Sequence, residues 1–265
     1  ILRDLGDFDR ADTLFERSLT LESSRQPART LHEVELLYHR ALLMLHLGKL
    51  GAARAALDEA ERKRTGLIGE RWTGLVWARH WNALLALAEG DLETSATLLD
   101  RMLVDYAKHF GEASHLLAFA RSDRAYTALA QRDLALADRL FEAAAARLRS
   151  LQLNPHPRLA EPLLGRALIA LARGDRRAAQ RHALEAMRIR SELPMQATGV
   201  AGWRDNACRV VALTGADCSA PDGLAVLDGG LDSLRLQRAL DGVCGMLPLP
   251  EAYAKACGPR LGAAR

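Results

Sequence analysis

The residues best suited to recognise another molecule are aromatic, and they gather in one short segment. Aromatic residues make up 5% of the 265-residue chain, yet three of its four tryptophans fall within ten residues. The segment holds Trp72, Trp77 and Trp81, with Arg71, Arg79 and His80 beside them. Large rigid rings and arginines dominate binding at protein interfaces. The segment therefore predicts a surface that binds a peptide or protein, and packing between helices is the alternative role of its rings.

Metal binding and catalysis have weaker support. His32, His39 and His46 recur every seven residues, so they share one face of a helix. Neighbours in this row lie about 10 Å apart along the helix axis, which is too far to hold one ion together. The chain lacks phosphate-loop, dinucleotide-binding, zinc-protease, nucleophile-elbow and kinase motifs. We therefore expect no metal, no cofactor and no catalysis by this segment.

The composition indicates an all-α protein. Leu and Ala number 49 and 47, whereas Val and Ile together number 12. Helix formers thus far exceed the β-branched residues that strands favour. The net charge of +3 is too balanced to predict nucleic-acid binding. Charged residues interrupt the apolar stretches before they reach the ~18 residues of a membrane span, so we expect no membrane insertion.

A repeat of about 42 residues organises the chain. Short polar turns follow apolar runs and centre on residues 6, 48, 90, 132, 174 and 215. Small residues keep the same register, namely Ala11, Ala53, Ser95, Ala137 and Ala179 after the turns and Ala41, Ala83, Ala125 and Ala167 before them. Gly at a turn ends a helix, so each repeat is predicted to be a pair of antiparallel helices. One pair cannot bury its own apolar stripe, and successive pairs must therefore stack.

Residues 5–19, LGDFDRADTLFERSL, resemble the turn and second helix of the tetratricopeptide repeat (TPR) family. The 42-residue period is similar to the long-helix TPR variety of kinesin light chains and bacterial signalling proteins. Two features depart from the family pattern. Arg132 occupies a turn position that is Gly in sister repeats, and a large first-helix residue is replaced by Arg40, Asn82, Arg124 and Arg166.

The resemblance implies a right-handed α-solenoid of stacked antiparallel helix hairpins over residues 1–215. It also implies a concave groove, lined by the first helix of each hairpin, that holds a protein or peptide. The positions that would face this groove are Glu35, Tyr38, Trp77, Arg79, His80, Trp81, Phe119, Ser122 and Glu161.

The repeat fades after Gly215, and residues 216–265 form a second region. Residues 231–243 predict one more helix, which we expect to cap the open end of the array and to be followed by a partly flexible tail. Residue 1 is Ile, and we expect the chain to be part of a longer protein with at least part of a repeat upstream.

All four cysteines lie in the last quarter of the chain, at Cys208, Cys218, Cys244 and Cys257, and their spacing matches no zinc pattern. Because no secretion signal is present, reduced thiols and a cytoplasmic location are expected. A small-molecule or catalytic role of this segment is one further hypothesis, which a cysteine with a lowered pKa would support.

The sequence predicts a non-catalytic scaffold that binds a protein or peptide. The resemblance implies the interaction or sensor region of a larger bacterial signalling or regulatory protein, such as one with an upstream kinase or a transcription regulator. The alternative is a stand-alone scaffold or chaperone-type adaptor outside signalling. Neither interpretation specifies the partner or an oligomeric state.

Overall fold

The computed structural model describes residues 8–24, 31–68, 75–151, 157–191, 208, 210–214, 231–244 and 246. Within these residues all regular structure is helical, and the prediction of an all-α protein is confirmed there. The first five helices are α1 (Phe8–Ser23), α2 (Leu31–His46), α3 (Leu50–Ile68), α4 (Leu75–Glu89) and α5 (Leu92–Phe110). The remaining elements are α6 (His115–Ala130), α7 (Leu134–Arg149), the short 3-10 helix η1 (Pro157–Leu159), α8 (Ala160–Ala172), α9 (Arg176–Ser191) and α11 (Leu231–Cys244).

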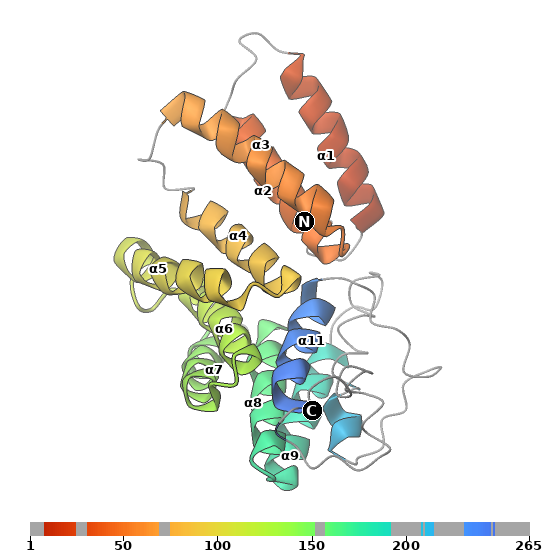
Figure 1. The fold of residues 1–265 in the computed structure, drawn as a ribbon, viewed down its shortest axis with the longest axis vertical. Coiled ribbons are helices and arrows are strands. Elements are labelled where there is room, and N and C mark those ends of the chain that lie inside the picture. Colours follow the sequence, from red (N-terminus) through yellow and green to blue (C-terminus); the bar gives the residue numbers. More distant parts are fainter. Residues whose placement is uncertain are drawn as a thin grey trace, which may run out of the picture.

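Consecutive helices pack in pairs, as Figure 1 shows. The pairs with the most extensive contacts are α2 with α3, α4 with α5, α6 with α7 and α8 with α9. The small residues that recur in the sequence explain this closeness, because Ala53, Ser95, Ala137 and Ala179 are all fully buried. A larger side chain in that column would hold the two helices of a pair apart.

The turns within the four pairs share one backbone geometry. Gly48, Gly90 and Gly174 have φ angles of 68°, 89° and 78°, and Arg132 has 67° at the equivalent turn. At each turn two successive N–H groups donate back to the preceding helix, for example from Asp91 to the Ala86 oxygen at 2.9 Å. This is the bonding of a helix C-terminus that ends in a left-handed residue, which favours Gly. Arg132 therefore adopts a conformation that is strained for a residue with a side chain.

Arginine pairs tie successive helix pairs together. Arg124 of α6 donates to both carboxylate oxygens of Asp100 in α5, at 2.8 and 3.2 Å. Arg40 and Arg166 make the same kind of ion pair with α1 and α7. Asn82, at the equivalent place in α4, is shorter and donates to its own helix. The arginines that depart from the TPR pattern thus act as links between neighbouring pairs.

The predicted capping helix lies along the first helices of the pairs. Helix α11 packs most extensively on α6, also on α4 and α8, and less on α2 (Figure 1). Its side chains Leu236, Ala239, Leu240 and Val243 are buried in one core cluster with residues of α6 and α8. Helix α11 was expected to cap the open end of the array, but its apolar stripe covers a face formed by several helix pairs.

The structure bears on two expectations, that the thiols are reduced and that no segment enters a membrane. Cys208 is disulfide-bonded, so the expectation of reduced thiols is wrong for this residue. Sequence spacing could not reveal this, because pairing depends on the approach of two Cα atoms in the fold. A disulfide is typical of oxidising compartments, so this bond does not support the predicted cytoplasmic location. Among the described residues, no helix combines the length and apolar character needed to cross a membrane.

Candidate binding face of the first helices

The residues predicted to line a groove differ in exposure. Glu35 is exposed, and Trp77, Arg79 and Phe119 are half-buried. The others, Tyr38, His80, Trp81, Ser122 and Glu161, are buried. The predicted set therefore mixes surface positions with positions that lie under other elements.

The aromatic segment packs between helix pairs. Trp81 is 7% exposed, and its ring centroid lies 5.3 Å from that of Tyr38 in α2. Trp77 stacks on Trp81 and meets the edge of Tyr106 in α5 at 5.5 Å. Arg79 forms an ion pair with Asp105 of α5. These rings support the packing alternative for Trp81, while Trp77 keeps an exposed part; Arg71 and Trp72 lie outside the described residues.

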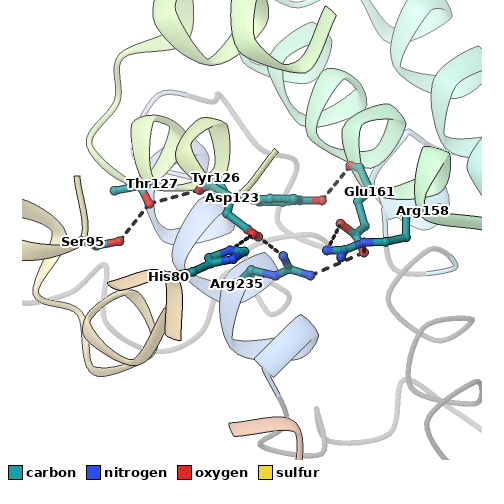
Figure 2. Close-up of polar contacts among 8 residues, drawn as sticks. All are labelled: His80, Ser95, Asp123, Tyr126, Thr127, Arg158, Glu161 and Arg235. Atoms are coloured by element: carbon teal, nitrogen blue, oxygen red, sulfur yellow. Dashed lines mark hydrogen bonds and ion pairs between the residues drawn. The ribbon is translucent and has the colours of Figure 1, made fainter. Parts of the chain in front are cut away.

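A buried polar cluster joins α4, α6 and α11, and Asp123 is at its centre (Figure 2). His80 Nε2 lies 2.7 Å from one carboxylate oxygen of Asp123. Arg235 Nη1 of α11 donates to the other oxygen, across 112 residues of sequence. Asp123 is 1% exposed and Arg235 is 4% exposed. One carboxylate therefore links the first helices of two pairs to the helix that covers them.

The cluster keeps Asp123 charged. Burial alone raises the pKa of the carboxyl, but the positive charge of Arg235 and the hydrogen bond from His80 outweigh it and lower the pKa to about 2. The carboxylate is therefore ionised at neutral pH. A charge so deeply buried needs its partners, because an isolated one would be strongly unfavourable.

Arg235 has a second set of contacts on α8 and α6. Its Nη2 lies 3.7 Å from a carboxylate oxygen of Glu161, and its guanidinium lies 5.5 Å from the centroid of the Tyr126 ring. Arg158 holds the Glu161 carboxylate with a bond of 3.2 Å, and the Tyr126 hydroxyl donates to the Glu161 carbonyl at 2.8 Å (Figure 2). The two terminal nitrogens of the Arg235 guanidinium thus face two different carboxylates, those of Asp123 and Glu161.

Hydroxyl groups hold the helix segment that carries Asp123. The Thr127 hydroxyl donates to the Asp123 carbonyl at 3.2 Å, so the Ser95 hydroxyl of α5 is left to donate to Thr127, also at 3.2 Å (Figure 2). This short chain links α5 to α6 behind the carboxylate. It orients the segment without removing the negative charge.

Two further residues of α11 touch backbone atoms of the first helices. Arg238 donates to the Ala88 carbonyl near the end of α4 at 3.0 Å. At Gly242 an added Cβ would lie 2.2 Å from the Leu129 carbonyl oxygen of α6. A side chain at Gly242 would therefore push α11 away from α6. We call the surface of α4, α6 and α8 that α11 covers the first-helix face.

The described part of this cluster contains neither a nucleophile in contact with a base nor a metal site. His80 and Asp123 resemble the base and orienting group of a nucleophilic site, but the buried Ser122 hydroxyl has no hydrogen-bond partner among the described residues. Nucleophilic catalysis needs a contact between nucleophile and base. Among the same residues, no group of three or more His, Cys, Asp or Glu side chains could hold a metal ion.

The predicted set includes four residues in or beside this cluster, but it lacks Asp123 and the arginines that contact it and Glu161. His80, Phe119, Ser122 and Glu161 came from the two columns expected on the first helices. Asp123 lies one residue after Ser122, at a position where the other repeats carry His39, Trp81 and Gly165. A carboxylate that occurs at this position in one repeat was the sequence signal that could have identified it. Arg235 and Arg238 lie outside the repeat register, so no column could identify them.

Comparisons with known proteins establish the fold alone. No family model matches the chain, and no curated protein sequence does. The structure is similar to that of BtubC (BKLC) from P. vanneervenii, with a TM-score of 0.59. The two share 16% sequence identity, and the match covers 97% of this chain and 95% of BtubC. The chain therefore shares its overall helical architecture with BtubC.

Proposed function

We propose that this chain is a non-catalytic binding scaffold, a right-handed solenoid of TPR-like helix pairs whose first helices hold a helical segment of a protein partner. In keeping with the long-repeat TPR proteins that it resembles, it would serve as the interaction region of a larger regulatory protein.

The placement of α11 carries this proposal. A helix from outside the repeat register lies on the first helices of three pairs, with its apolar side chains in their core. Docking of an amphipathic helix into a groove is a common mode of peptide recognition, with anchors spaced three and four residues apart. Helix α11 occupies the first-helix face in this way, which supports a partner helix that docks there with similar anchors.

A display selection of random 16-residue peptides against the full chain tests the proposal. We expect enriched peptides that bind with micromolar dissociation constants, measured by fluorescence anisotropy. Their affinity should fall at least tenfold for Glu161→Gln, which removes a charge from the first-helix face, because interface anchors commonly contribute this much.

Glu93→Gln is the matched control, since Glu93 is an exposed carboxylate on the second helix α5. It should leave the affinity unchanged. If no peptide is enriched, or if both variants weaken binding equally, the first helices are not the binding surface and the proposal fails.

A further inference from the structure

We infer that α11 is a built-in competitor for the first-helix face, and that the partner is an amphipathic helix that presents the two arginines and the glycine of α11 and displaces it. This inference rests on the proposed function and adds to it the class of partner and the means of control.

Charge complementarity selects an arginine at the centre of the partner helix. Without α11, Asp123 would keep His80 as its described side-chain partner but would lose the guanidinium of Arg235, whose positive charge acts most strongly on it. Removing one member of a buried ion pair is strongly unfavourable. A cation in the docking helix removes this penalty, whereas an apolar residue leaves it.

The geometry specifies arginine over lysine. Nη1 of Arg235 contacts Asp123 while Nη2 faces Glu161 at 3.7 Å, and the guanidinium lies over the Tyr126 ring. A guanidinium presents a planar fork that can address two carboxylates and lie over a ring, but an ammonium is a single point charge. A partner with Lys at this position could contact Asp123, but it would neither place a second donor near Glu161 nor lay a planar group over the ring.

A second arginine and a glycine set the register of the helix. Arg238 lies one turn after Arg235 and donates to a carbonyl at the C-terminal end of α4, where the helix dipole is negative. Gly242 lies two turns after Arg235 and lets the helix backbone approach that of α6. The buried apolar positions lie between and after these anchors. The partner pattern is therefore Arg, apolar, any, Arg, small, Leu, any, Gly, Val, as in residues 235–243.

The composition of this contact suits exchange of one helix for another. Buried ion pairs add little net stability, because their attraction is offset by the loss of hydration, and they act mainly on specificity. A tethered helix competes with an effective concentration of the order of 1 mM. A free helix with a dissociation constant of about 10 µM for the empty face would thus bind the wild-type chain about 100-fold more weakly.

The test uses a fluorescent peptide of residues 231–246 with Cys244→Ser, titrated into full-length chains. Gly242→Ala should release α11, because the new Cβ would meet the Leu129 carbonyl oxygen. We expect this variant to bind the peptide at least tenfold more tightly than the wild type does. Asp241→Ala is the matched control, since Asp241 is exposed on α11 and its loss should leave α11 docked and peptide binding weak.

Variants of the peptide test the pattern itself. Arg235→Lys or Gly242→Ala in the peptide should each reduce its affinity for the Gly242→Ala chain at least tenfold. The inference is overturned if the folded variant chain binds the peptide no better than the wild type, or if the Lys peptide binds as well as the Arg peptide. Gel filtration that shows a dimer of the variant chain would also overturn it, in favour of a second copy as the occupant.

A second measurement covers the case in which Gly242→Ala does not fold. Isotopically distinct peptide added in excess to the wild-type chain should raise hydrogen exchange in α11 and leave exchange in α7 unchanged. No rise in α11 would overturn the inference. Display-selected peptides that still bind the first-helix face would then show that the proposed function survives without it, whereas their absence would remove both.

Discussion

The strongest quantitative prediction concerns Arg235, whose substitution should undock α11. Arg235→Gln leaves Asp123 buried with His80 as its described side-chain partner, and it also removes the charge that faces Glu161. Breaking a buried ion pair on one side costs about 3–5 kcal/mol. Each 1.36 kcal/mol is a factor of ten in an equilibrium constant. The equilibrium constant for opening of α11 should therefore rise about 200- to 5,000-fold, which exceeds the roughly 100-fold preference for docking, so α11 should be mostly undocked.

Native-state hydrogen exchange measures this change directly, since amides exchange through local opening. The amides of α11 should lose the protection that docking provides, about 100-fold, while those of α7 keep theirs. Arg238→Gln is the matched control, being the same substitution one turn away on the same helix. Its half-buried side chain makes one hydrogen bond to a carbonyl, worth about 1 kcal/mol, so about fivefold is expected.

A double-mutant cycle completes the test. Asp123→Asn together with Arg235→Gln should destabilise the docked helix no more than Arg235→Gln alone, because the buried charge is removed with its partner. Equal losses of protection for Arg235→Gln and Arg238→Gln would refute the assignment of Arg235 as the anchor. So would additive effects in the cycle, since they would mean that the two charges do not interact.

Three further predictions follow from the turns, the helix packing and the buried carboxylate. Arg132→Gly should raise the free energy of unfolding by about 1 kcal/mol because it relieves the left-handed strain, and Gly90→Ala should lower it by a similar amount. Urea titrations followed by circular dichroism will detect both changes. A lower free energy of unfolding for Arg132→Gly would contradict the strain at this turn. Gly165→Ala should lower the melting temperature by an amount equivalent to about 1–3 kcal/mol, because its Cβ would lie 2.2 Å from the Phe141 ring, and unchanged melting would show that the ring can move aside. The pKa of Asp123 is lowered in the folded chain, so the unfolded chain binds a proton first as the pH falls. About 2 kcal/mol of the free energy of unfolding, present above pH ~4, should therefore be lost as the pH falls toward the folded pKa of about 2. Urea titrations at pH 7 and 2.5 measure this loss, and the Asp123→Asn variant should lack it.

Much of the fold could be predicted because its causes are local. A glycine that must adopt a positive φ marks the same turn at Gly48, Gly90 and Gly174, and an Asp after the turn accepts an N–H of the next helix at Asp91 and Asp133. Fully buried small residues recur at the same distance from each turn. These signals depend on a few neighbouring residues, so they can be read along the chain.

The candidate site was predictable only in part. The repeat register placed His80, Phe119, Ser122 and Glu161 on the first helices, but it assigned them to an open groove. It could not show that a later helix covers some of them, nor that the Trp81 ring fills space between helix pairs. The column positions specify a face of a helix, whereas exposure depends on what else packs there.

The sequence by itself determined the helical class, the 42-residue register and the turns, because periodicity and backbone preference act over a few residues. Only the tertiary structure decided that α11 lies on α4, α6 and α8 and that Arg235 meets Asp123 across 112 residues. An amphipathic helix specifies that one of its faces will be buried, but not against which surface. That choice is made by the charges, the apolar side chains and the close backbone approach that the folded helix pairs bring together.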